Sequence, residues 1–248
     1  MTTGRPGAAR GVAVIGGGIA GTGAAVAAAE AGAEVILFDG GPGASLLASG
    51  GLDGDLDLRV THFLSSFGGY DTGSDVRLVT TAGVLRSATA HDAALLDVSR
   101  AKDGPVGVVD CDRPGLDARA LARAWGDGFE VVEATVLRHT DERVLPDADF
   151  AARHDDAERL AWLGARLREA IGKGGGRLRA LVLPSCLGIE RARARELVEI
   201  AGIPCGEAIG LPGGPAGLRF ERARDRALAA ARVSHVRERA RSLTKTAR

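Results

Sequence analysis

Closely spaced glycines near the N-terminus have the spacing of a site that binds a pyrophosphate. They lie in the run Gly16-Gly17-Gly18-Ile19-Ala20-Gly21. The first glycine permits a tight turn, the third lets the backbone approach a phosphate, and the last lets a following helix pack against a strand. Unpaired N–H groups at the start of that helix would then face the phosphates. We therefore take all six residues as candidate cofactor-binding residues.

The segments on either side of the glycines strengthen this interpretation. Residues 12–15 form a β-branched apolar run, residues 22–31 are almost all small, and Gly32 follows as a helix C-terminal signal. A second apolar run at residues 35–38 ends at Asp39, whose carboxylate is placed to accept a hydrogen bond from a ribose 2′-OH. A 2′-phosphate would be repelled there, which favours FAD or NAD over NADP. The alternative is a βαβ unit whose glycines serve packing alone.

Two further glycine-rich segments have to be considered as phosphate-binding loops. Small residues and hydroxyl groups follow the second strand, and within them Ser49 and Gly50 are candidates for a second phosphate-binding loop; a plain surface loop is the alternative. The cluster Gly172-Lys173-Gly174-Gly175-Gly176 lacks the spacing of an ATP-binding P-loop. It therefore predicts a turn.

Composition limits the classes of protein that this chain can belong to. The chain has 248 residues, of which 45% are hydrophobic and 26% charged, with a formal net charge of zero. That balance gives no argument for a nucleic-acid partner or a membrane surface. No apolar run has the length of a membrane span, and the stretch after Arg5 and Arg10 is broken by glycines, so it is not interpreted as a signal peptide.

The three cysteines, Cys111, Cys186 and Cys205, form no C-x-x-C pair and are odd in number. They fit neither a disulfide framework nor a zinc site, so the sequence predicts no metal ligands and a reducing, cytoplasmic location.

The C-terminal region carries an excess of positive charge. From Leu218 onward three acids face ten basic residues, namely Arg219, Arg222, Arg224, Arg226, Arg232, Arg237, Arg239, Arg241, Lys245 and Arg248. A solvated amphipathic helix explains this pattern; a docking surface for an acidic partner or anionic lipid is the sharper alternative.

Hydrophobic periodicity and turn residues predict a mixed α/β chain. Beyond Asp39 the expected strands are residues 76–79, 83–87, 106–110, 131–138 and 178–183, with an extended segment at 206–211; the expected helices are residues 117–125, 150–171, 190–201 and 219 onward. This order predicts a Rossmann-like FAD/NAD(P)-binding domain with an inserted mixed α/β substrate or cap region. The expected boundaries are 1–45 for the first βαβ unit, 46–217 for the remainder with its insertion, and 218–248 for a basic C-terminal helix.

Four further segments resemble the B subunit of anaerobic glycerol-3-phosphate dehydrogenase. They are the serine-glycine loop at residues 49–53, the threonine-x-glycine-x-leucine-arginine hairpin at 81–86, the leucine-proline-x-x-leucine-glycine segment at 183–188 and the proline-rich turn at 212–219. The resemblance covers roughly residues 11–228. Members of that family continue past the position of Arg248 to a late glycine-aspartate motif that contacts the flavin, so this chain is expected to be a shortened relative.

The resemblance implies a flavin-dependent subunit that oxidises glycerol 3-phosphate to dihydroxyacetone phosphate. FAD is the expected cofactor, with FMN as second choice. A catalytic subunit and an iron–sulfur subunit are the implied partners, and they would connect this chain to membrane quinones only indirectly.

Alcohol oxidation requires a base near the hydroxyl group, and a phosphorylated substrate requires a cation. His62 lies nearest the predicted flavin-facing loop, although a surface histidine is the simpler interpretation. Arg86 and Arg219 lie in the family-like segments and bind either a phosphate or a carboxylate of the fold. No catalytic residue is assigned. Another FAD- or NAD-dependent oxidoreductase and a non-catalytic docking subunit remain alternative functions.

Overall fold

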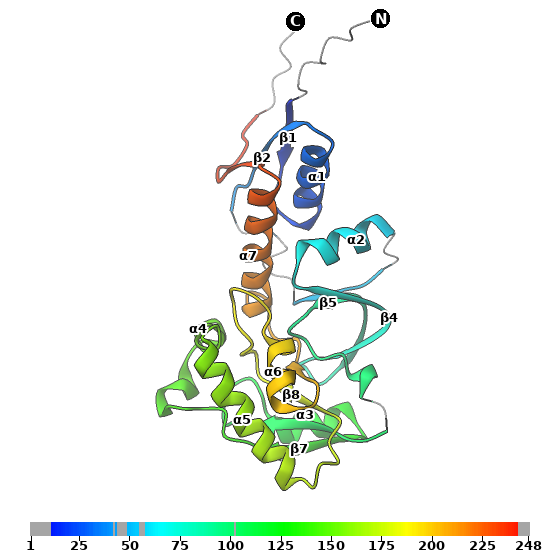
Figure 1. Ribbon diagram of the computed structural model, residues 1–248, viewed down its shortest axis with the longest axis vertical. Helices are drawn as coiled ribbons and strands as arrows, with labels where there is room; N and C mark the ends of the chain where they lie inside the picture. The colour runs from blue at the N-terminus through cyan, green and yellow to red at the C-terminus, as the bar shows by residue number, and fades with distance from the viewer. Residues whose placement is uncertain (1–10, 42, 44–48, 55–57, 102, 243–248) are drawn as a thin grey trace, which may run out of the picture. The chain divides into compact units, whose positions relative to one another are not determined.

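A computed structural model describes residues 11–41, 43, 49–54, 58–101 and 103–242. The chain divides into two compact units (Figure 1). The first unit combines the N-terminal segment to Leu46 with the segment from Ala223 to the C-terminus, and the second spans Leu47–Arg222. Arg5 and Arg10, considered above for a signal peptide, lie outside the described residues.

The first unit begins with the strand–helix–strand motif that the sequence predicts. Strand β1 (Gly11–Ile15) and strand β2 (Glu34–Phe38) pair in parallel, with Val12 opposite Val35 and Ile15 opposite Phe38. Helix α1 (Ile19–Glu30) connects them and ends where Gly32 takes a positive φ of 85°. Glycine adopts that conformation without the steric cost of a Cβ atom, so the predicted helix end is confirmed.

A segment near the C-terminus adds a third strand to this unit. Helix α7 (Pro215–Ala230) ends in the first unit and is followed by strand β10 (Ser234–Val236), which pairs in parallel with β2. The strand order is β1-β2-β10, and Leu228 and Val233 share a small core with Ala25, Val35 and Leu37. The prediction of one basic helix over residues 218–248 is therefore wrong.

Strand β10 was not predicted from the sequence because no glycine marks the end of α7. Arg232 takes the left-handed conformation, with φ of 57°, that usually falls to glycine. The N–H of Val233 donates to the carbonyl of Leu228 at 2.9 Å, which closes the last turn.

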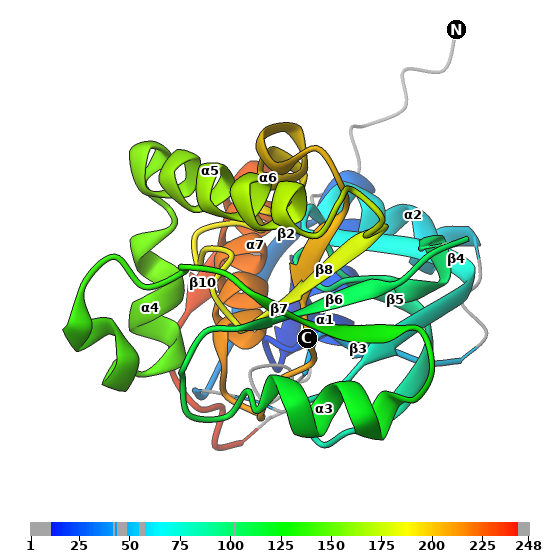
Figure 2. The same ribbon diagram turned by 90° about the horizontal axis from the view of Figure 1, so that it is seen from below.

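The second unit contains a four-stranded parallel sheet in the order β7-β6-β8-β9. Its strands are β6 (Val106–Asp110), β7 (Phe129–Glu133), β8 (Ala180–Leu183) and β9 (Cys205–Glu207). Figure 2 shows α5 (Ala157–Lys173) and α6 (Ala194–Ala201) on one side of the sheet, and α3 (Ala118–Trp125) on the other. These layers enclose an extensive hydrophobic core, to which Val108, Leu163 and Leu181 belong.

The second unit also contains an antiparallel sheet of order β3-β5-β4. Strands β4 (Tyr70–Val79) and β5 (Leu85–Asp92) form the predicted hairpin, β3 (Gly51–Leu52) pairs with β5, and helix α2 (Leu58–Phe67) precedes β4. Isolated bridges from Leu95 to Glu207 and from Thr80 to Ile209 connect this sheet with the segment around β9. A short 3-10 helix, Val98–Arg100, follows the hairpin.

Two other expectations are corrected by local hydrogen bonds. The single helix expected over residues 150–171 is two helices, α4 (Asp147–Arg153) and α5, because Asp156 caps a new helix through the N–H of Arg159 at 2.8 Å. The helix expected from residue 190 begins at Ala194, because Asp155 instead accepts the N–H groups of Ile189 and Glu190.

A third expectation, the strand at residues 131–138, is also too long at its C-terminal end. Strand β7 stops at Glu133, and the 3-10 helix Thr140–Val144 lies beyond it.

The predicted fold class is confirmed as a mixed α/β fold with a Rossmann-like unit. The boundaries differ from the expected 1–45, 46–217 and 218–248, because the first unit is assembled from both ends of the chain.

Candidate functional site

The glycine turn of the first unit has the backbone geometry that its sequence predicts. Gly16 has φ of 103°, and its N–H donates to the carbonyl of Phe38 at 2.8 Å. A Cβ atom at Gly21 would lie 1.7 Å from the carbonyl oxygen of Gly16, so only glycine fits where α1 packs against the turn. The first and last glycines thus serve the structural roles assigned to them.

Helix α1 begins at a glycine. Its N-cap is Gly18, which has no side chain to cap the helix, and the first turn contains no acidic residue. The N–H groups of a first helical turn have no partner within the helix, and together with the helix dipole they favour an anion. This end of α1 is therefore suited to a phosphate group.

A pocket of about 610 Å³ surrounds this helix end. It is lined by the residues Ile15 to Gly21, Phe38 to Gly41, Gly43, Arg239 and Ala240. Residue 42 and residues 44–48 of the neighbouring loop lie outside the described residues. All six glycine-motif candidates and Asp39 thus border one cavity.

Asp39 has a partner that sequence reasoning missed. Its Oδ2 atom lies 2.9 Å from Nη1 of Arg224 in α7 and 3.6 Å from Nε2 of His235 in β10. Both Asp39 and Arg224 are buried. The carboxylate is therefore not an isolated negative charge, which weakens the argument that it repels a 2′-phosphate. Both of these contacts use Oδ2, so we expect a ribose hydroxyl group to be bound by the other carboxylate oxygen, Oδ1.

The segment after β10 also borders the pocket. A Cβ atom at Gly40 would lie 3.1 Å from Cβ of Arg239. The segments around these two residues therefore pack closely at this end of the cavity. Arg239 is exposed and makes no ion pair with a described residue, which leaves its guanidinium group free for an anionic ligand. The sequence shows the positive charge of the C-terminal region, but it does not show that this region pairs with β2.

Ser49 and Gly50 belong to the second unit. Gly50 has φ of 92°, and its carbonyl accepts the N–H of Asp92 at 2.7 Å. Their contact with a cofactor stays a prediction.

The other candidate side chains are placed less favourably for catalysis. His62 lies exposed on α2. Arg86 pairs with Asp53 at 2.8 Å, and Arg219 is buried between Asp92 and Glu207. For both arginines the carboxylate alternative is therefore the one the structure shows.

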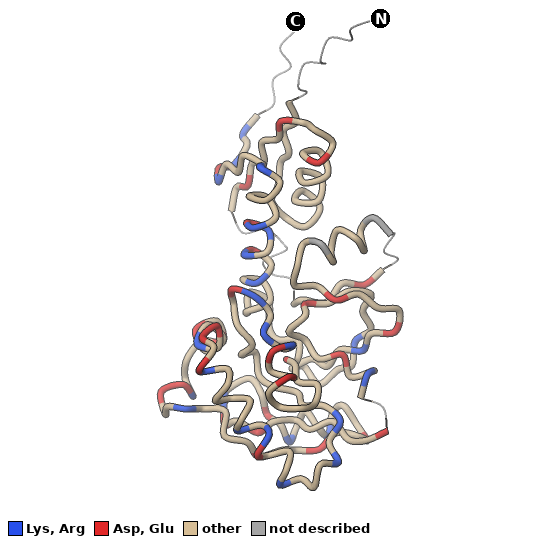
Figure 3. Tube along the Cα trace, viewed as in Figure 1, with Lys and Arg blue, Asp and Glu red and all other residues tan. Residues whose placement is uncertain are grey.

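Several arginines of the basic C-terminal region form ion pairs that the sequence did not reveal. Blue segments mark Lys and Arg along α7 in Figure 3, but Arg219 and Arg224 are buried in ion pairs and Arg222 pairs with Glu190 at 3.1 Å. These three arginines thus form ion pairs within the fold, and the docking surface stays a prediction.

The cysteines lie in the second unit, free and buried. Burial raises the pKa of the Cys111 thiol to about 11 and that of the Cys205 thiol to about 12, so neither is a reactive thiolate near neutral pH. Within the described ranges, no group of three His, Cys, Asp or Glu side chains is arranged to hold a metal ion. None of the helices there has the length and hydrophobicity to cross a membrane.

A protein-family comparison matches the N-terminal segment that contains the glycine turn. The family described as FAD binding domain matches residues 11–60, which include β1, α1, β2 and the glycine turn. Searches of curated proteins and of solved structures found no match. The match supports FAD as the cofactor and a flavin-dependent, enzyme-type protein.

The donor set around the pocket fits FAD. A helix N-terminus with glycine as its N-cap and a side-chain-free turn suit the pyrophosphate, and a carboxylate at Asp39 suits a ribose hydroxyl.

Replacing Arg224 with methionine is expected to destabilise the first unit by about 2–3 kcal/mol, because it leaves the buried Asp39 carboxylate without its main partner. Chemical denaturation of both proteins measures the difference. The double variant Arg224→Met/Asp39→Asn should regain most of the loss. Arg222→Met, which removes an exposed pair in the same helix, is the control and should cost less than about 1 kcal/mol. Equal losses in Arg224→Met and Arg222→Met would refute the buried ion pair.

Proposed function

We propose that this chain is the FAD-binding subunit of an oxidoreductase that converts glycerol 3-phosphate to dihydroxyacetone phosphate. The observation that carries the flavin part is the N-terminus of α1, with a glycine as its N-cap, beside a glycine turn in a segment matched by the FAD binding domain family. The substrate part rests on the sequence resemblance to the B subunit of anaerobic glycerol-3-phosphate dehydrogenase. Bound FAD would supply the hydride acceptor for alcohol oxidation.

In this proposal the residues of the first unit bind and orient the cofactor. The N–H groups of α1 hold the pyrophosphate, Asp39 holds the adenosine ribose, and Arg224 fixes the Asp39 carboxylate. FMN has no adenosine ribose, so a site that uses Asp39 favours FAD. A catalytic subunit and an iron–sulfur subunit are the proposed partners. Any membrane association, on the cytoplasmic side, would be through them.

Anaerobic addition of glycerol 3-phosphate to the FAD-loaded protein tests the substrate. Bleaching of the visible flavin absorbance, with dihydroxyacetone phosphate formed in equal amount, is the expected result. Glycerol, which lacks the phosphate, is the control and should leave the flavin oxidised. Bound FAD that stays oxidised with glycerol 3-phosphate, alone or with the partner subunits, would assign the chain to another flavin-dependent reaction.

A further inference from the structure

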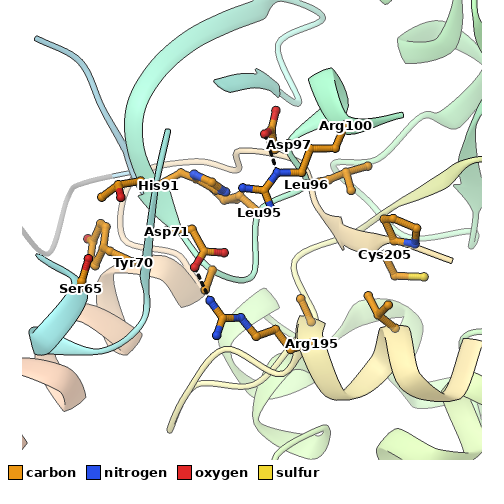
Figure 4. A pocket seen from close by; sticks show the side chains of 15 residues that line it. Ser65, Tyr70, Asp71, His91, Leu95, Leu96, Asp97, Arg100, Arg195 and Cys205 are labelled. Carbon is orange, nitrogen blue, oxygen red and sulfur yellow. Dashed lines mark hydrogen bonds and ion pairs between the residues drawn. The ribbon is translucent and has the colours of Figure 1, made fainter. Parts of the chain in front are cut away.

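Two cavities of the second unit differ in how their charged side chains are used. One has a volume of about 640 Å³, and His91 belongs to its lining (Figure 4). Its arginines are paired with acids of the same lining. Arg195 pairs with Asp71. Arg100 pairs with Asp97 at 3.0 Å. The charges of this cavity are therefore balanced within the fold.

The other cavity, of about 850 Å³, lies along strand β7. Its lining comes from α3, from the turn that follows it and from β7, namely Arg119, Ala122, Arg123, residues 126–131 and Glu133. Arg119 lies 4.0 Å from Asp110. Arg123 and Glu133 are exposed, and neither forms an ion pair within the described part of the chain. This groove thus holds a cation and an anion that the fold does not pair.

Strand β7 is the outer strand of its sheet. The N–H of Val106 in β6 donates to the carbonyl of Gly128 at 2.8 Å. Because successive strand residues direct their backbone groups to alternate sides, those of Phe129, Val131 and Glu133 point away from β6. None of the described segments pairs with this edge. It also lacks the proline or bulge that often blocks the pairing of an edge strand, and Val131 is 36% exposed.

The side chains of these three residues lie on the face of the sheet that α3 covers. Side chains two residues apart in a strand share a face, and the ring of Phe129 packs on Trp125, the last residue of α3, with centroids 5.3 Å apart. Helix α3 connects two parallel strands, so it runs in the opposite direction to β7. Arg123 therefore lies toward the Phe129 end of the strand, and Glu133 lies at the other end.

We infer that the β7 edge binds a second copy of this chain, with the two β7 strands antiparallel about a twofold axis at Val131. In this register Val131 lies opposite Val131 of the second copy, and Phe129 lies opposite Glu133. The outward N–H and C=O groups of both strands then satisfy each other. The two four-stranded sheets become one continuous sheet.

The charges of the groove favour a second copy as the partner. The twofold axis brings Glu133 of the second copy to the end of β7 where Arg123 lies, and it repeats this pair on the other side. Glu130, the other acid of the strand, pairs with Arg177 of its own chain at 2.9 Å and would lie opposite Val132. No like charges are therefore directly opposed, and the acid that discourages other strands has a counter-charge in this one arrangement.

Analytical ultracentrifugation of the full chain over a range of protein concentrations tests the inference. The average mass should rise with concentration from that of one chain toward that of two. This association belongs to the second unit, so it should occur with and without added FAD. A chain that stays monomeric at every concentration would overturn the inference and leave the edge to a different partner.

Substitution at the twofold axis identifies the surface. Val131→Lys places two ammonium groups opposite each other and should weaken the dimer at least about tenfold. The side chain is exposed, so the variant should melt as the original chain does. Leu211→Lys is the control, because Leu211 is 80% exposed and follows β9 at the other edge of the sheet. It should leave the dimer unchanged. Equal association of the Val131→Lys and original chains would place the contact elsewhere and refute the β7 edge.

Charge reversal tests the pairing of Arg123 with Glu133. Arg123→Glu and Glu133→Arg should each weaken the dimer about tenfold, because the axis makes each reversal count twice. The double variant Arg123→Glu/Glu133→Arg restores opposite charges and should recover most of the affinity. A double variant that associates no better than either single variant would contradict this register.

A new thiol at the axis gives a second measurement. Cα atoms of a hydrogen-bonded antiparallel pair lie about 5.5 Å apart, within the range of a disulfide. Mild oxidation of Val131→Cys should therefore give a covalent dimer, seen on a non-reducing gel. The original chain, whose cysteines are buried, and Leu211→Cys should stay largely uncrosslinked. Crosslinking of Leu211→Cys to the same extent as Val131→Cys would count against the inference.

Discussion

Replacing Gly18 with valine is expected to weaken FAD binding by at least about 100-fold. Gly18 lines the nucleotide pocket and is the N-cap of α1, so a branched side chain there would occupy the space where a phosphate meets the helix. Its backbone, with φ of −72° and ψ of −176°, is open to any residue. The variant should therefore fold. Equilibrium dialysis against FAD measures the loss, and thermal melting verifies the fold.

Gly11→Val is the matched control for this experiment. Gly11 begins β1, and a Cβ atom there would meet no other atom within 4 Å. A β-branched residue is well suited to a strand, so FAD binding should be unchanged. Undiminished FAD binding in a folded Gly18→Val protein would remove the basis for a nucleotide site at this helix.

The largest loss of stability is expected from Arg219→Met, at about 3–5 kcal/mol. Arg219 is 5% exposed and binds Asp92 at 2.8 Å, Glu207 at 2.7 Å and the carbonyl of Gly188 at 2.7 Å. Its removal leaves two buried carboxylates and a carbonyl without that donor. Burial raises the pKa of Glu207, and the charge of Arg219 opposes that shift. In the variant, Glu207 would take up a proton more readily.

Two comparisons make this prediction specific. Arg86→Met, which breaks the exposed pair with Asp53, should cost less than about 1 kcal/mol. The triple variant Arg219→Met/Asp92→Asn/Glu207→Gln should recover most of the loss, because neutral amides need no buried counter-charge. The amide oxygen of the new glutamine side chain can still accept the N–H groups of Cys186 and Leu187 that the Glu207 carboxylate accepts. Unfolding curves of the four proteins in urea give the values. A loss under about 1 kcal/mol in Arg219→Met would show that the cluster does not stabilise the second unit.

The first βαβ unit could be predicted from sequence because its signals are local. Gly16 sets the turn, Gly32 ends the helix, and Asp39 marks the end of β2. The same holds for α3, where Asp117 caps the helix through the N–H of Ala120 at 2.9 Å. In these elements one residue type at one position decides the local conformation.

Two helix boundaries were predicted wrongly, because the sequence signal was absent at one and was given too little weight at the other. Helix α7 ends at Ala230 and is followed by a left-handed arginine, Arg232, where the expected signal is a glycine. The break before α5 has a signal, the N-cap residue Asp156, but the apolar periodicity across residues 150–171 outweighed it.

Side-chain partners were beyond the reach of sequence patterns. Arg224 and Asp39 are separated by 185 residues, and Arg219 and Asp92 by 127. His91, Arg100 and Arg195 meet around one cavity only because β5, the segment after it and α6 pack together. Residue type restricted each arginine to an anionic partner, but the tertiary fold determined which one.

The amount of flavin bound per chain tests the central claim most directly. The purified protein is incubated with FAD, freed of excess by gel filtration, and its visible absorption spectrum recorded; chromatography then identifies the flavin that heat releases. The account predicts a yellow protein that releases FAD in an amount equal to the protein. A folded protein that stays colourless after this treatment, or one that retains FMN and not FAD, would contradict a dinucleotide site at the glycine turn.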